Sequence, residues 1–336
     1  MFQVSTLNKK QFNAAASETL LAAALRSDVL LEHSCKTGRC GACKVQVPVG
    51  STIAVMDEVG LTLREKLTGW VLTCARTALC DLQLSVEDLG SLRLHPAKTI
   101  PCRIQGLERL ASDVVLVRLR LPTQQDFRYH PGQYVDVIGP GGVRRSYSIA
   151  NAPAPDQLIE LHIRRVDGGA MSEYWFERAK LNDLLRLNGP SGTFVLRDVV
   201  GMDLVFLATG TGIAPVKAML ESFVSLPVEA FPRSVRLYWG GRSPVDLYWT
   251  PKVPLPGFSY TPVLSRTSSH WHGFQGYVQQ ALLADVSDFS NAVVYACGSP
   301  EMITSAREQI LAAGLAVNRF RSDAFLASNT INNSNL

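Results

Sequence analysis

The spacing of four cysteines is the chemically most informative feature of this chain. Cys35, Cys40 and Cys43 follow one another as C-x4-C-x2-C, and Cys74 comes about thirty residues later. This spacing is typical of four thiolates that hold a [2Fe–2S] cluster. Small residues crowd the loop, as they must if backbone N–H groups are to turn inward toward the sulfurs. We therefore expect four metal ligands here, and a protein that moves one electron at a time.

Length and composition narrow the class of protein around these cysteines. A chain of 336 residues is too long for one ordinary core, so we expect two or three domains. The net charge of +4 is too weak to indicate nucleic acid binding. No stretch of 18 apolar residues predicts a membrane span, and no secretory signal is recognisable. Seven cysteines at uneven spacing fit a reducing compartment, so we expect a cytoplasmic protein.

The chain divides into three segments of different character. Residues 1–92 hold the cysteine loop, with an early strand, a helix over Ser17–Leu25 capped by Ser17, and a late strand. This order suits a β-grasp ferredoxin. Residues 100–198 alternate strands and turns, which predicts a small antiparallel barrel. Residues 199–336 alternate strands and helices, which predicts a parallel, Rossmann-like sheet.

Two motifs in the middle segment are suited to a flavin or a phosphate. Arg145 offers a cationic fork, Tyr147 can stack on a flat ring, and Ser148 can hydrogen-bond a ring nitrogen. Gly169 opens a helix where backbone N–H groups could approach a pyrophosphate. Taken alone, each motif is also explained by chance or by an ordinary turn. Their order within one barrel favours a cofactor site.

Three strand ends in the last segment could form a nucleotide site. Gly210, Thr211 and Gly212 join a buried strand to a helix as a phosphate-cradling turn, although a turn needed only for packing remains an alternative. Two later strands end in motifs that would lie at the same edge of the sheet. Their candidate residues are Tyr238, Gly240 and Arg242 on one strand, and Cys297, Gly298 and Pro300 on the other. For Cys297, a buried core thiol is the alternative to contact with a nicotinamide.

Taken together, these motifs resemble the ferredoxin–NADP reductase superfamily. R-x-Y-S, G-x-x-S, T-G-T-G-x-A-P and C-G-S-P-E-M occur in that order. With the cysteine loop in front, residues 1–328 resemble the fused reductases of benzoate-type dioxygenases, of methane monooxygenase and of 3,6-dideoxyhexose synthesis. The run Phe320–Asn329 is more narrowly similar to the tail of CDP-6-deoxy-Δ3,4-glucoseen reductases. Thr209 departs from the family, which usually has a glycine there, and we expect it to crowd the phosphate turn slightly.

The resemblance implies FAD in the barrel and NADH in the third domain. It places three residues beside the reacting rings: Ser148 near flavin N5, Cys297 at the nicotinamide and Phe325 over the flavin ring. An apolar anchor for the tail is the other interpretation of Phe325. The residues matching the FAD motifs are Arg145, Tyr147, Ser148, Gly169, Met171 and Ser172, with His162, Ile163 and Arg164 on the strand that follows the FAD phosphate and ribose. The residues matching the NADH motifs are Gly210, Thr211, Gly212, Tyr238, Gly240, Arg242, Cys297, Gly298 and Pro300.

The electron path implied by the resemblance runs from NADH through FAD to the cluster. Flavin can turn one two-electron event into two one-electron steps, which a cluster requires. NADPH is the less favoured donor, with Arg242 and Arg233 as candidate partners of its extra phosphate.

Several recipients of the electron are compatible with the sequence. The tail favours a pyridoxamine-phosphate-dependent iron–sulfur dehydrase acting on CDP-4-keto-6-deoxyglucose. An oxygenase component is the alternative recipient. A third interpretation concerns the chain itself, as a carrier or binding module in which the ferredoxin is joined to a flavin-free barrel. No nucleic acid or membrane partner is expected. Lys36, Arg39 and Lys44 could contact the partner or could form a solvated rim.

Overall fold

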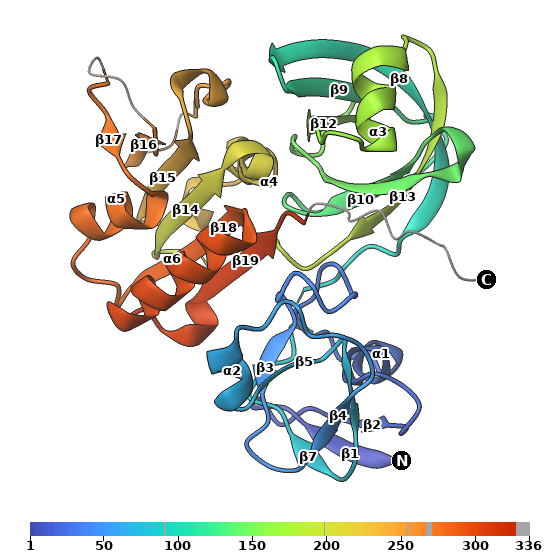
Figure 1. The fold of residues 1–336 in the computed structure, drawn as a ribbon, viewed down its shortest axis with the longest axis vertical. Coiled ribbons are helices and arrows are strands. Elements are labelled where there is room, and N and C mark those ends of the chain that lie inside the picture. The colour runs from blue at the N-terminus through green and yellow to red at the C-terminus, as the bar shows by residue number, and fades with distance from the viewer. Residues whose placement is uncertain (91, 198, 254, 256, 267–270, 327–336) are drawn as a thin grey trace.

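The computed structural model describes the chain except for residues 91, 198, 254, 256, 267–270 and 327–336. The predicted domain boundary at 198 and the end of the tail motif, residues 327–329, lie outside the described residues. Figure 1 shows three bodies, with the N-terminal body placed against both the barrel and the C-terminal sheet. Among the described helices, none is long and apolar enough to cross a membrane.

The first body is built from short strands around one helix. Its central sheet has the order β2-β1-β7, and two further pairs join β3 to β5 and β4 to β6. The helix begins at Leu20 and not at Ser17, because the Thr19 hydroxyl accepts from the Ala22 N–H and caps it. The elements are β1 (Phe2–Ser5), β2 (Gln11–Ala14), α1 (Leu20–Arg26), β3 (Lys44–Gln46), β4 (Thr52–Ala54), α2 (Leu63–Leu67), β5 (Trp70–Leu72), β6 (Arg76–Ala78) and β7 (Leu82–Gln83).

The second body is an antiparallel barrel. Its six strands have the order β11-β10-β13-β8-β9-β12. A bridge between Ile149 and Leu161 joins the end of β11 to β12, so the two outer strands of the sheet meet. The elements are β8 (Lys98–Ala111), β9 (Val114–Arg120), β10 (Tyr134–Ile138), β11 (Arg144–Ser148), β12 (Leu158–Arg164), α3 (Ala170–Glu173) and β13 (Leu184–Ser191).

The third body is a parallel sheet with helices on both faces. Its strand order is β17-β16-β15-β14-β18-β19, and every pairing is parallel. Because the strands are parallel, the carboxyl ends of β14, β15 and β18 meet at one edge. The elements are β14 (Asp203–Thr209), α4 (Ile213–Ser222), β15 (Ser234–Gly241), β16 (Phe258–Leu264), β17 (Phe274–Gln275), α5 (Val278–Asp285), β18 (Ala292–Gly298), α6 (Pro300–Ala312) and β19 (Phe320–Ala324).

Specific contacts hold the first body against the other two. The His33 N–H donates to the Thr193 hydroxyl of the barrel at 2.8 Å, and the Thr193 N–H donates back to the His33 carbonyl at 3.0 Å. On the other side, the guanidinium of Arg307 on α6 lies 5.4 Å from the centre of the Trp70 ring. The cysteine loop is therefore positioned by both neighbours.

Candidate functional site

The four cysteine sulfurs lie in two pairs. Cys43 Sγ and Cys74 Sγ are 3.2 Å apart, and none of the four is in a disulfide. The Cys35 sulfur accepts from the backbone N–H groups of Thr37 and Cys40, both at 3.4 Å. A hydrogen bond from the Cys40 thiol is the main reason that the pKa of Cys35 is lowered to about 4. Two pairs of thiolates suit two irons with two ligands each.

The loop around these sulfurs depends on glycine. Gly38 has φ +71°, and a Cβ there would lie 2.1 Å from the Asp57 carbonyl oxygen.

Among the described residues, no group of three or more His, Cys, Asp or Glu is arranged around a single metal ion. A two-iron cluster spreads its ligands over two metals, so the paired thiols and the inward N–H groups fit it.

The predicted flavin residues of the barrel lie on neighbouring elements. Ser148 is buried at the end of β11 and pairs with Tyr134 of β10. The Tyr147 hydroxyl accepts from the Trp175 Nε1–H at 3.1 Å, and burial raises its pKa to about 12. Arg145 precedes Tyr147 and Ser148 on β11, and its side chain donates to the backbone carbonyl of Arg144.

The predicted pyrophosphate turn packs against the same barrel. Gly169 is the N-cap of α3, and the Ser172 hydroxyl accepts from the Val166 N–H at 2.9 Å, which closes the turn. A Cβ on Gly139 would lie 2.4 Å from the Met171 sulfur, so Met171 packs directly over the loop that follows β10. These positions fit an FAD site, and the individual contacts stay predictions.

One face of β12 points away from the barrel core and toward the third body. Ile163 is buried in the barrel core, whereas His162 and Arg164 lie on the opposite face. His162 Nδ1 is 3.2 Å from the Tyr248 hydroxyl, and burial lowers the pKa of His162 to about 3. Arg164 makes charge contacts with Asp246 at 3.5 Å and with Asp113 at 3.2 Å. The side chains predicted to follow FAD therefore lie between the two bodies.

A pocket of about 650 Å³ occupies the carboxyl edge of the parallel sheet. A Cβ on Gly212 would lie 2.2 Å from the Cys297 carbonyl oxygen, and one on Gly298 would lie 2.0 Å from Thr209 Oγ1. These glycines let the turn after β14 pack closely against the end of β18, with Thr209 between them. The predicted residues that line this pocket are Arg164, Gly210, Thr211, Gly240, Arg242, Gly298 and Phe325.

Some predicted dinucleotide contacts lie elsewhere. The Tyr238 side chain is buried in the core, where its hydroxyl donates to Asp285 at 2.9 Å. The Cys297 thiol is fully buried, and burial raises its pKa. Any contact of these two residues with a dinucleotide would therefore fall to their backbone. Pro300 is the first residue of α6, which Ser299 caps, and it lines a different cleft.

Arg233 does not lie beside Arg242, contrary to the suggestion that both could reach an extra phosphate. Arg233 precedes β15 and forms an ion pair with Asp203 at the amino ends of the strands. Arg242 follows the last residue of β15. A strand of this length separates its two ends by more than 20 Å, on the order of 3.3 Å per residue.

A junction where the three bodies meet next to the cysteine loop was not predicted from the sequence. The Tyr134 hydroxyl of the barrel donates to the Ser34 carbonyl at 2.9 Å. The Ser34 hydroxyl donates to Asp323 Oδ1 of β19 at 2.8 Å. Burial raises the pKa of Asp323 to about 6. Beyond Asp323, the Phe325 N–H donates to the Gly298 carbonyl at 2.8 Å, so this junction continues into the dinucleotide pocket.

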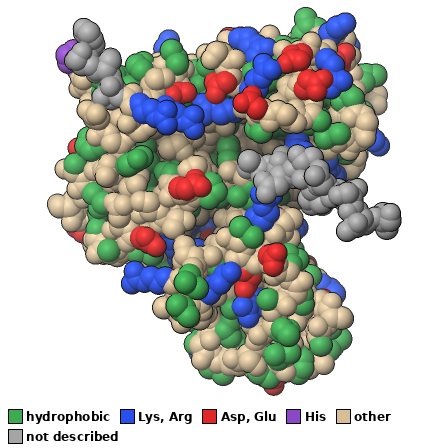
Figure 2. Space-filling view, viewed as in Figure 1, with side chains coloured by type: hydrophobic (Ala, Val, Ile, Leu, Met, Phe, Trp, Pro, Cys, Tyr) green, Lys and Arg blue, Asp and Glu red, His purple; other side chains and the backbone are tan. Residues whose placement is uncertain are grey.

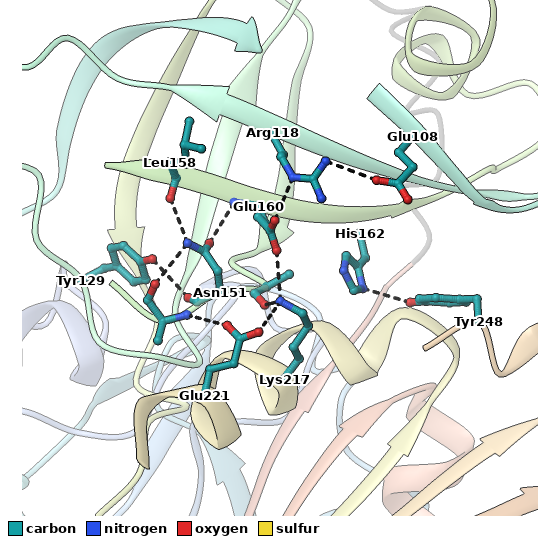
Figure 3. A network of polar contacts seen from close by, with 12 residues as sticks. Glu108, Arg118, Tyr129, Asn151, Leu158, Glu160, His162, Lys217, Glu221 and Tyr248 are labelled. Atoms are coloured by element: carbon teal, nitrogen blue, oxygen red, sulfur yellow. Dashed lines mark hydrogen bonds and ion pairs between the residues drawn. The ribbon is translucent and has the colours of Figure 1, made fainter. Parts of the chain in front are cut away.

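A second set of polar residues joins the barrel to the third body (Figure 3). Lys217 of α4 lies against Glu160 of β12, and Glu221 accepts from the Ala152 N–H at 3.2 Å. Burial opposes ionisation of Glu160, but the charges of Lys217 and Arg118 outweigh it and hold the pKa of this carboxyl below its usual value. A lysine within the apolar helix that follows the glycine turn was the available sequence signal.

Comparison with protein families gives three matches in chain order. Residues 5–79 match a 2Fe-2S iron-sulfur cluster binding domain, 101–196 an oxidoreductase FAD-binding domain and 206–308 an oxidoreductase NAD-binding domain. The cofactors are therefore a [2Fe–2S] cluster, FAD and a nicotinamide dinucleotide, and the predicted fold class is confirmed. The matched ranges fall inside the predicted domains 1–92, 100–198 and 199–336, whose boundaries stay predictions.

Individual proteins resemble the chain over nearly its whole length. CDP-6-deoxy-L-threo-D-glycero-4-hexulose-3-dehydrase reductase of Yersinia pestis is 41% identical, covering 94% of this chain and 96% of the relative. Protein RfbI of Salmonella typhimurium is 35% identical, covering 96% and 95%. Terephthalate 1,2-dioxygenase reductase component 1 of Comamonas sp is 31% identical, covering 95% of each. The solved ferredoxin reductase in carbazole 1,9a-dioxygenase is 25% identical, with a TM-score of 0.68, and covers 97% of this chain and 98% of that one.

Proposed function

Because the chain belongs to the family of iron–sulfur flavoprotein reductases with an N-terminal ferredoxin domain, we propose that it delivers electrons from NADH to a dehydrase of CDP-3,6-dideoxyhexose synthesis. The dehydrase would be a pyridoxamine-phosphate-dependent iron–sulfur protein. The identity of 41% to a hexulose-3-dehydrase reductase, over nearly the full length of both chains, is the observation that carries this choice of pathway. An oxygenase component is the second candidate partner, supported by the relative at 31%.

The geometry supports an electron path through the junction of the three bodies. Tyr134, Ser34 and Asp323 join the barrel, the cysteine loop and the strand that leads to the dinucleotide pocket. When bound, FAD supplies the conversion of one hydride into two single-electron transfers. The junction, together with the bonds between His33 and Thr193, keeps Cys35 beside the barrel that would hold the flavin.

The dinucleotide pocket would bind and orient its ligand mainly through backbone. The turn at Gly210–Gly212 presents N–H groups at the start of α4, where a pyrophosphate is favoured. Arg164 reaches into this turn from the barrel, with Nη1 2.8 Å from a Cβ built on Gly210. Phe325, which lines the same pocket, would help exclude water from the reacting atoms.

The charges at the pocket favour NADH over NADPH. Arg242 is at the rim, but Asp246 is there too, and its carboxylate accepts from the Arg242 and Ser243 N–H groups at 2.9 Å. A carboxylate at this edge of a sheet suits a ribose hydroxyl better than an added phosphate. Arg233, the other candidate, is at the opposite edge.

The third interpretation, a flavin-free carrier, is disfavoured by the FAD-binding domain match over 101–196. We place the protein in the cytoplasm, because seven cysteines at uneven spacing fit a reducing compartment.

The test of this function is a reconstituted reduction. The purified protein and NADH are added to the iron–sulfur dehydrase and CDP-4-keto-6-deoxyglucose, and loss of the C3 hydroxyl is followed by mass spectrometry. We expect turnover only when all components are present. Turnover that does not rise on adding this protein would overturn the proposed pathway. Oxygen uptake by a terephthalate oxygenase component with the same reductase tests the second candidate.

A further inference from the structure

Helix α2 of the ferredoxin body contributes nothing to the core. None of its five residues is buried, and Leu63 and Leu67 are 75% and 79% exposed. The helix is held by a capping box, in which Thr62 and Glu65 bond to each other's backbone N–H groups. So short a helix is marginal without packing, and two leucines four residues apart share one face. Packing within the described residues therefore does not account for two leucines as exposed as these.

The segment that leads into α2 lies directly on the cysteine loop. The Gly60 N–H donates to the Gly38 carbonyl at 2.9 Å, and the Val55 N–H donates to the carbonyl of Ala75, the neighbour of Cys74. The backbone of the segment thus faces the loop, while Val55, Met56 and Val59 are exposed. Together with the two leucines they form a set of exposed aliphatic side chains that we call the exit patch: Val55, Met56, Val59, Leu63 and Leu67.

The exit patch borders, through Val59, a cleft that reaches a predicted cluster ligand. The cleft has a volume of about 1420 Å³ and lies between the ferredoxin body and α6, and Val59 and Cys40 both line it. Ser34, the neighbour of Cys35, contacts the barrel and β19. The loop thus has one ligand beside the flavin-binding barrel and another beside the cleft. Figure 2 shows exposed hydrophobic side chains on the lower body, including the side where Figure 1 places α2.

The charges around the exit patch are predominantly positive. Within the segment and α2, Arg64 and Lys66 are exposed, against one exposed carboxylate, that of Asp57. Lys44, which the sequence suggested as a contact, is instead paired with Glu65. Cationic groups around an apolar surface favour a partner with acidic groups around its own apolar face, and they speed its approach.

We propose that the exit patch is the docking surface for the electron-accepting iron–sulfur protein, which would present an apolar face with an acidic rim. This inference rests on the proposed delivery of electrons to a partner protein. The partner would then reach the loop from the cleft beside Cys40, and the contacts of Ser34 with the barrel and β19 would stay in place.

The test uses the full-length protein with both cofactors and compares two double variants. Leu63→Gln with Leu67→Gln removes the apolar face of α2, and the exposed barrel leucines in Leu181→Gln with Leu184→Gln serve as the matched control. Because the two leucines would act as central anchors, we expect the first variant to raise the KM for the partner about tenfold or more, with the control unchanged. Reduction of the cluster by NADH, followed by stopped-flow absorbance, should be equal in all three proteins.

The acceptors are the CDP-hexulose dehydrase and the terephthalate oxygenase component, so failure of the pathway and failure of the docking surface can be separated. If only the oxygenase accepts electrons from the wild type, the proposed pathway fails. The docking surface is then tested by the KM values for the oxygenase. Equal KM values for the wild type and the α2 variant would overturn the patch. If neither acceptor is reduced by the wild type, both proposals fall. A wild-type dimer that the α2 variant converts to a monomer would assign the patch to a second copy and also overturn the inference.

Discussion

Lys217 Nζ lies 3.0 Å from Glu160 Oε2, which places an ion pair between α4 of the dinucleotide domain and β12 of the barrel. The same ammonium donates to the Ala150 carbonyl at 2.9 Å and pairs with Glu221 at 2.7 Å. Ala150 comes two residues after Ser148, at the end of the predicted flavin motif. One lysine thus connects the barrel strands predicted to bind flavin to the helix that follows the glycine turn, and Figure 3 shows this lysine against Glu160.

We predict that Lys217→Met slows reduction of the flavin by NADH at least about tenfold, because a small misplacement of two reacting groups is costly. The variant leaves Glu160 without its lysine but still paired with Arg118, so stability should fall by about 1 to 2 kcal/mol. Stopped-flow absorbance gives the rate. Lys180→Met, at an exposed lysine of the barrel, is the control. Lys217→Arg should restore part of the rate, and a Met variant as fast as the wild type would refute the role.

His162 gives a prediction about pH. Its pKa is about 3 in the folded protein, against 6.5 for an ordinary histidine. As the pH falls below 6.5, the unfolded chain binds a proton that the folded chain cannot, so stability is lost. At pH 5 the loss from this group should be on the order of 2 kcal/mol. His162→Asn removes this loss. Lowering the pH from 7.5 to 5 should therefore destabilise the variant less than the wild type.

Urea unfolding at the two pH values measures this shift. His272→Asn, at an exposed histidine, should follow the wild type at both. Parallel profiles for His162→Asn and the wild type would mean that His162 is protonated within the fold.

Arg164 tests whether its strand, β12, contributes to the FAD site of the barrel or to the dinucleotide pocket of the third body. Its side chain lines the dinucleotide pocket, whereas the sequence motif assigns it to FAD. We predict that Arg164→Met raises the KM for NADH about tenfold, as expected for loss of a charged hydrogen bond, and leaves the FAD content unchanged. Arg165→Met is the matched control, because Arg165 points away and pairs with Glu177 at 2.7 Å. Loss of FAD with an unchanged KM would favour the assignment from the motif.

The cysteine loop and the order of the elements could be predicted from the sequence because both depend on local spacing. The contacts between bodies could not. Which face of β12 turns toward the third body depends on Tyr248 and Lys217, which are far away in the chain. Tyr134 and Ser34 likewise meet only in the folded protein, 100 residues apart. The start of α1 was misplaced because Ser17 and Thr19 are both good caps, and only the structure shows which hydroxyl reaches the helix.

The most direct test of the account is an anaerobic titration of the purified protein with NADH, followed by visible absorbance and EPR. FAD takes two electrons and the cluster one, so about 1.5 equivalents of NADH should bleach both chromophores and produce the EPR signal of a reduced [2Fe–2S] cluster. Changing Cys74 to Ser should abolish that signal and leave bleaching of the flavin. A wild-type flavin that bleaches while the cluster stays oxidised would contradict the path from NADH through FAD to the four cysteines.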